Sequence, residues 1–202
     1  MAVIAYHLIW TNYGTWLPND LRGSGSHDVY TPALAELGRP HFGRKKIQPK
    51  RNMVRQFCEE AQSRLQFPVI RFDASQREVI AAGFAHVILS QQFTCYACAL
   101  MPDHVHLVVR KHRHQAEEMI ELFQEESRRR LGSTGALSPD HPVWTKNGWK
   151  VYLDTPEAVW SRIRYVERNP LKEGLPRQFW PFVMPYDNWP FHRQRTEPRP
   201  RE

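Results

Sequence analysis

The stretch Phe93–Arg110, with the sequence FTCYACALMPDHVHLVVR, contains two apolar runs separated by Met-Pro-Asp at positions 101–103. Short apolar runs that are bounded by turn residues are typical of strands. The stretch therefore predicts a β-hairpin or two adjacent strands, at Phe93–Leu100 and Val105–Arg110.

A histidine pair stands at the start of the second run. His104 and His106 are two residues apart, and side chains with this spacing project to the same face of a strand. Two imidazoles that point the same way can hold a divalent cation, so both histidines are candidate metal ligands. The pair His112 and His114 has the same spacing, but lysine and arginine beside it would repel a cation.

Outward from the hairpin, helical and strand patterns alternate along the chain. Ser75 and Glu78 have the spacing of a capping box, and Thr155 can cap the last helix with Pro156 at its first position. The order βαββαβα predicts an α+β sandwich in which helices cover one face of an antiparallel sheet. The expected elements besides the hairpin are a strand at Ala5–Thr11, a helix at Ser75–Gln91, a helix at Gln115–Leu131, a strand near Trp149–Leu153 and a helix after Thr155.

Residues 19–72 interrupt this pattern with glycines, prolines and a basic run. Met53, Phe57, Ala61 and Leu65 recur at intervals of four and indicate one short helix there. We interpret the region as an insertion in a single domain of residues 1–192. Residues 193–202 are charged and rich in proline, so we expect this basic tail to be disordered.

The last predicted helix carries a tyrosine away from its apolar stripe. Val159, Ile163 and Val166 fall on one side, and about 100° per residue places Tyr165 outside that stripe. Arginines lie on the same polar face, and Asn169 is one turn away. Tyr165 is either an exposed aromatic residue or a nucleophile toward a phosphodiester. Asn169 is a candidate oxygen ligand, and the proline after it predicts that the helix ends or bends there.

The charge of the chain favours a polyanionic partner. The sequence has 28 Lys and Arg against 21 Asp and Glu, a formal net charge of +7, which by itself does not separate nucleic acid from a membrane surface. No secretion signal and no long apolar segment is recognisable, so we expect a cytoplasmic protein that does not enter a membrane.

Three cysteines, Cys58, Cys95 and Cys98, are too few and of the wrong parity for a disulfide framework. The CxxC spacing of Cys95 and Cys98 and the nearby histidine pair leave a zinc site open as an alternative. Residues three apart lie on opposite faces of a regular strand, so a shared metal would need a β-bulge. We therefore predict that both are buried core cysteines.

Three stretches together resemble the single-tyrosine HUH transposases of the insertion-sequence-200 type, and among them the REP-associated tyrosine transposases. AYHLIWTNYGTWLP, with Tyr6 and His7, is similar to the first strand of this family. MPDHVHLVV is similar to its HUH motif, and YVERNPLKEGL, which starts at Tyr165, to its tyrosine helix. The resemblance spans roughly 5–16 and 84–175, and the insertion departs from the compact family pattern.

This resemblance implies a ferredoxin-like domain that processes single-stranded DNA. His104, His106 and Asn169 would hold Mg²⁺ or Mn²⁺, and Tyr165 would attack a DNA phosphate to form a 5′-phosphotyrosine that a free 3′-OH later reverses. Such relatives act near imperfect hairpins, as monomers or homodimers. The basic residues expected to contact the DNA strand are Lys45, Lys46, Arg51, Arg128, Arg129, Arg130, Arg162 and Arg168.

Two other hypotheses remain at this point. One is a binding protein derived from a transposase, which would grip hairpin DNA or RNA without cutting it. The other is a zinc hydrolase or structural zinc protein that uses the two cysteines of the CxxC and the two histidines of the HxH.

Overall fold

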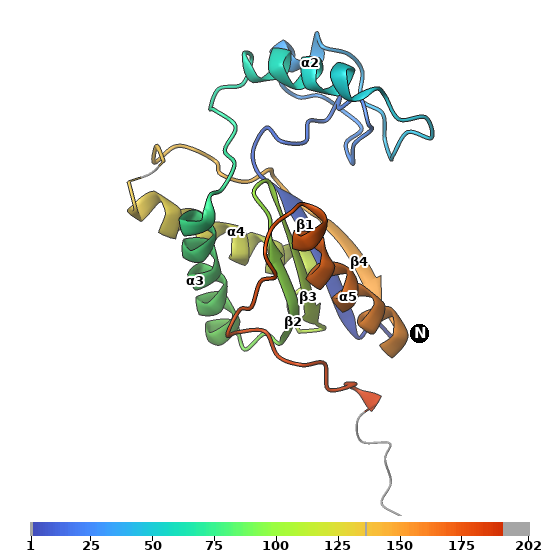
Figure 1. Ribbon diagram of the computed structural model, residues 1–202, viewed down its shortest axis with the longest axis vertical. Helices are drawn as coiled ribbons and strands as arrows, with labels where there is room; N and C mark the ends of the chain where they lie inside the picture. Colours follow the sequence, from blue (N-terminus) through green and yellow to red (C-terminus); the bar gives the residue numbers. More distant parts are fainter. Residues whose placement is uncertain (1, 136, 192–202) are drawn as a thin grey trace, which may run out of the picture.

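The computed structural model describes residues 2–135 and 137–191, so the predicted tail at 193–202 lies outside the described residues. If the helices inside the insertion are set aside, the predicted order βαββαβα is present (Figure 1). The elements are β1 (Ala5–Thr11), α1 (Pro32–Ala35), α2 (Arg51–Gln62), α3 (Ala74–Gln91), β2 (Cys95–Leu100), β3 (His104–Arg110), α4 (Ala116–Ser133), β4 (Trp149–Leu153) and α5 (Pro156–Lys172).

The four strands form one antiparallel sheet in the order β2-β3-β1-β4. The strand with the histidine pair, β3, therefore lies inside the sheet next to β1, as a ferredoxin-like sandwich requires. Ile9 of β1 is opposite His106 on one side and opposite Trp149 on the other. These three residues thus form one row across three neighbouring strands, a row that runs through the candidate site.

Helices cover both faces of the sheet (Figure 1). The helices α3 and α4 pack on one face around a core that includes Trp10, Phe84 and Phe123. The helix α5 packs on the other face, where Val159 and Ile163 join a second core. The prediction that helices cover one face was therefore incomplete. The reason for the second cover is visible in β2, where every residue is buried. A strand whose two sides are both apolar needs a packed element on each face.

Local signals explain where the helices begin. The Thr155 hydroxyl accepts the Ala158 N–H at 3.1 Å, and Pro156 follows as the first helical residue, as predicted. The capping box of α3 is formed by Asp73 and Gln76, so the assignment to Ser75 and Glu78 was wrong by two residues. The Asp73 carboxylate accepts the Gln76 N–H at 2.8 Å, and an aspartate is among the best N-cap residues.

The insertion forms a small lobe with its own apolar cluster. Its buried members are Leu17, Leu34, Phe57 and Ala61. The predicted short helix is present as α2, which ends before Leu65. Figure 1 shows the lobe beyond the end of the sheet where β1 ends and β3 begins. Within the described ranges, no helix is long and apolar enough to cross a membrane.

Candidate active site

The face of the sheet that α5 covers carries three histidines. Val105 and Leu107 point into the core under α3 and α4, so the alternation of β3 turns His104 and His106 toward α5. His7 of β1 lies on the same face. The ring centroids of His104 and His106 are 4.9 Å apart, and those of His7 and His106 are 5.1 Å apart.

Tyr165 joins this cluster from α5. Its ring centroid lies 5.6 Å from that of His106 and 6.0 Å from that of His7, while 39% of the residue stays exposed. The apolar stripe of α5 anchors the helix on the sheet and leaves Tyr165 at the edge of the contact. Lys172 Nζ and Arg162 Cζ lie 4.7 and 5.7 Å from the centre of the ring. The structure thus brings together a phenol, imidazoles and two cations from distant parts of the chain.

His104 is oriented by groups on both of its ring nitrogens. Its Nδ1–H donates to the Asp103 carboxylate at 2.7 Å, and its Nε2 lies 3.3 Å from the amide nitrogen of Asn169. The hydrogen bond from His104 holds the pKa of Asp103 below its usual range, and the ion pair with Arg71 contributes. The carboxylate is therefore charged and fixes the tautomer in which Nε2 keeps its lone pair.

His106 is buried and has a partner that the sequence did not identify. Its Nδ1 lies 3.0 Å from Nε2 of His7, a fully buried residue. Burial lowers the pKa of His106 to about 2 and that of His7 to about 3, with the charge of Arg162 contributing to both. Both rings are thus neutral, and one proton lies between them. If His106 Nδ1–H donates to His7, the Nε2 of His106 is free to bind a cation.

The sequence places His7 in the stretch AYHLIWTNYGTWLP but assigns it no chemical role. The available signal was an imidazole within an otherwise apolar strand, since a polar ring in such a position needs a buried partner. The pairing of β1 with β3 supplies this partner, His106.

The residues around this point suit a divalent cation in kind. Two imidazole nitrogens and one amide oxygen would leave positions open for phosphate oxygens and water. Asn169 is buried, and rotation of its amide by 180° would present the oxygen where the nitrogen now faces His104. Clusters of three or more His, Cys, Asp and Glu that could hold a metal are absent from the described part of the chain. A ligand set at this point would therefore consist of the two imidazoles and the Asn169 amide.

The two cysteines of β2 lie on the other side of the sheet. A register shift between Cys95 and Ala97 turns Cys95 and Cys98 to the same face, so the expectation of opposite faces was wrong. Both belong to the core under α3 and α4, as predicted for buried cysteines. The sheet therefore separates both thiols from His104 and His106, and the four side chains do not form a zinc site.

The predicted DNA-contacting residues fall into three groups. Arg162 and Arg168 lie on α5 with Tyr165, and Lys45, Lys46 and Arg51 lie on the insertion. The three arginines at 128–130 lie on α4, which covers the opposite face of the sheet, and two of them are paired with Glu126. The structure thus brings Arg162 to the tyrosine, keeps Arg168 on the same helix and leaves the α4 arginines across the sheet.

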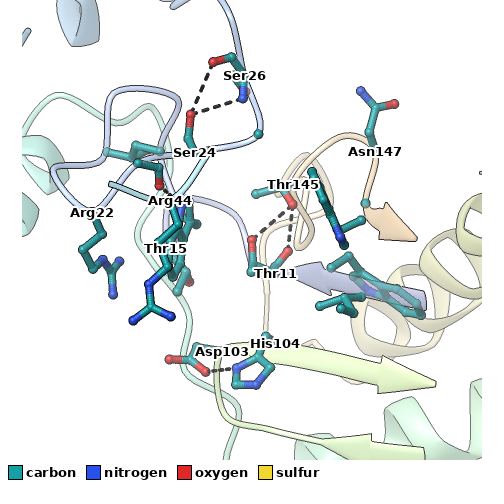
Figure 2. Close-up of a pocket in the computed structure, with 18 of the residues that line it drawn as sticks. Thr11, Thr15, Arg22, Ser24, Ser26, Arg44, Asp103, His104, Thr145 and Asn147 are labelled. Carbon is teal, nitrogen blue, oxygen red and sulfur yellow. Dashed lines mark hydrogen bonds and ion pairs between the residues drawn. The ribbon is translucent and has the colours of Figure 1, made fainter. Parts of the chain in front are cut away.

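A cleft of about 820 Å³ opens beside the histidine pair. Figure 2 shows Arg22 and Arg44 of the insertion on one side of this cleft and Asn147 on the other. Asp103 and His104 lie together at its base (Figure 2). The insertion therefore forms part of the surroundings of the candidate site.

Comparison with known proteins adds two similar solved structures. No protein-family model and no curated protein matches the chain. A REP-associated tyrosine transposase bound to a REP hairpin is 11% identical, with a TM-score of 0.49 over 90% of this chain and 76% of the other. A candidate transposase from Deinococcus radiodurans R1 is 14% identical, with a TM-score of 0.35 over 88% of this chain and 95% of the other. At these values, function has to be argued from the chain's own residues.

Proposed function

We propose that the protein is a transposase-like enzyme that nicks and rejoins single-stranded DNA through Tyr165. One observation carries the proposal. Two distant segments, β3 and α5, meet at the edge of the contact between α5 and the sheet, and there they bring together Tyr165, His104, His106 and Asn169. A protein that only bound DNA would have no need for a partly exposed phenol beside two oriented imidazoles.

The chemical step would be a transesterification. The Tyr165 oxygen attacks a backbone phosphorus, a P–O bond to the tyrosine forms, and the P–O bond to the 3′ oxygen breaks. The phenol loses its proton and the departing 3′ oxygen gains one, so the products are a 5′-phosphotyrosine and a free 3′-OH. Because the number of phosphoester bonds is conserved, a 3′-OH can attack the phosphotyrosine and rejoin a strand.

The side chains around Tyr165 have definite tasks in this scheme. Lys172 and Arg162 supply positive charge beside the phenol and the incoming phosphate. His104, His106 and Asn169 would hold Mg²⁺ or Mn²⁺, which when bound withdraws charge from the non-bridging phosphate oxygens. The Asp103 carboxylate keeps His104 in the tautomer that can bind a cation.

The substrate class follows from charge and from access. The net charge of +7 favours a polyanion, and the cleft beside the histidines gives a strand a path to the site. We extend the proposal to DNA that carries a hairpin, as the sequence resemblance implies.

Covalent capture of DNA tests the proposal. The protein is incubated with Mg²⁺ or Mn²⁺ and a labelled single strand that carries a hairpin, and the adduct is resolved on a denaturing gel. We expect an adduct that Tyr165→Phe abolishes. The matched control is Tyr152→Phe, because Tyr152 is 54% exposed on β4 and contacts Tyr6 rather than the histidines.

The outcomes separate the two DNA hypotheses. An adduct that persists in Tyr165→Phe removes this residue from the mechanism. Tight hairpin binding without an adduct under any metal condition would instead support a non-catalytic binding protein.

A further inference from the structure

The wall of the cleft opposite the sheet is built from two insertion segments that are joined by backbone hydrogen bonds. The Ser24 N–H donates to the His41 carbonyl oxygen at 2.9 Å, and the Gly43 N–H donates to the Ser24 carbonyl oxygen at 2.7 Å. Gly23 makes this approach possible, since a Cβ on it would lie 2.0 Å from the Gly43 carbonyl oxygen. Its φ of +98° also favours glycine. This wall therefore has a defined backbone path.

An indole stands on this wall in a fixed orientation. Trp16 is 41% exposed, and its Nε1–H donates to the Gly23 carbonyl at 2.9 Å. The Arg22 guanidinium lies 4.0 Å from the centre of the Trp16 ring and is held by two hydrogen bonds to the buried Asp20 carboxylate. Trp16 thus presents a preset aromatic surface to the cleft.

A second indole, on β4, also lines the cleft. Trp149 is 56% exposed and shares the sheet row and the sheet face of Ile9 and His106. Two strand spacings of about 4.8 Å place it about 10 Å from His106, which equals about three stacked nucleotides at roughly 3.4 Å each. A Cβ on Gly25 would lie 3.6 Å from the Trp149 ring, so the insertion reaches this indole.

Charged residues of both signs line the cleft. Asp103 lies at the histidine end, where it is hydrogen-bonded to His104 (Figure 2), and Glu173 is the other lining carboxylate. Arg44 and Lys146 also line the cleft, and neither has a carboxylate partner among residues 2–135 and 137–191. Their unpaired positive charges are available to phosphates.

We infer that this cleft binds an unpaired segment of the DNA strand next to the reacting phosphate. Bases stack on Trp149 and Trp16, and phosphates contact Arg44 and Lys146. Paired bases in a duplex have no free faces for such stacking, so the cleft selects single-stranded DNA. That this segment adjoins the reacting phosphate rests on the proposed function, whereas the binding itself does not.

The test measures binding of fluorescein-labelled oligothymidylate, dT15, by anisotropy in EDTA, where no metal-dependent cleavage occurs. We expect Trp149→Ala to weaken binding about five- to 150-fold, the loss associated with one stacked base. The control Tyr152→Ala removes an exposed aromatic residue from the same strand but from the opposite face, and binding should stay at the wild-type level.

A salt titration tests the cationic residues separately. The slope of log affinity against log salt should decrease by about 1.4 in the double variant Arg44→Ala/Lys146→Ala, at about 0.7 per phosphate contact on single strands. Arg113→Ala changes an exposed arginine beyond the end of β3 that is far from the histidine pair, and it should leave the slope unchanged.

Thermal melting first establishes that each variant is folded. Wild-type affinity in folded Trp149→Ala, or an equal loss in Tyr152→Ala, overturns the inference. Because the assay contains no metal, absence of a covalent adduct would refute the proposed function and leave this result intact, and the reverse also holds.

Discussion

Replacement of His7 tests whether the β1 histidine orients His106 for metal binding. His7→Phe keeps a ring of similar size on the same buried surface but removes the nitrogen that lies 3.0 Å from His106 Nδ1. Loss of a hydrogen-bond partner behind a metal-binding histidine typically lowers metal affinity about 10- to 100-fold. We therefore expect Mn²⁺ affinity to fall by this factor.

The effect of His7→Phe on the free energy of unfolding should be limited, for a reason visible in the structure. The substitution leaves His106 Nδ1 without its partner, which costs about 1–3 kcal/mol in a buried setting. It also removes His7 Nδ1, a buried atom that already has no hydrogen-bond partner in the described chain, and this offsets a cost of similar size. The free energy of unfolding should thus change by less than about 2 kcal/mol.

The assay is a Mn²⁺ titration without DNA, followed by the EPR signal of the free ion. Tyr6→Phe is the matched control, since Tyr6 is the neighbour of His7 in β1 and points to the other core. His7→Gln, which retains an acceptor oxygen, should recover part of the affinity. The reasoning fails if folded His7→Phe binds Mn²⁺ like the wild type, or if NMR shows that the Nδ1 of His106 carries no proton.

Three further predictions concern the surroundings of the site. Asp103→Asn removes the charge that orients His104, and Mn²⁺ affinity should fall about tenfold or more; an unchanged titration would contradict this. Gly23→Ala should destabilise the protein by about 1–3 kcal/mol in urea unfolding and weaken dT15 binding. Gly43→Ala should lower the free energy of unfolding by less, because Gly43 also has a positive φ but a Cβ there would meet open space. Equal losses in the two variants would refute the argument that Gly23 is needed for the close approach of the two segments. Burial raises the pKa of all three thiols, but only Cys58 is partly exposed, so at pH 8 the folded protein should react with a thiol reagent at Cys58 alone. Three rapid equivalents would show that the β2 thiols are accessible.

Most strands and helices were predictable because their signals are local. The bounds of β1 and β4 match the apolar runs at Ala5–Thr11 and Trp149–Leu153. The start of α5 follows from a threonine cap and a proline that need no distant partner. At the start of α3, spacing alone was insufficient to identify the N-cap. Asp73 rather than Ser75 caps the helix, because a carboxylate accepts a stronger hydrogen bond than a hydroxyl does.

An error arose where non-local packing decided the outcome. Alternation placed the two cysteines of β2 on opposite faces, yet a bulge turned both into one core. This result could not be derived locally, because a bulge depends on the pairing with the neighbouring strand.

By itself the sequence determined that His104 and His106 share a face and that Tyr165 stands apart from the apolar stripe of its helix, because periods of 2.0 and 3.6 residues are properties of the backbone. Only the tertiary structure decided that these side chains meet, that His7 joins them, and that the insertion closes a cleft against Trp149. The register of β1 against β3 and the docking of α5 depend on burying apolar side chains from distant segments together, and no short stretch of chain contains that information.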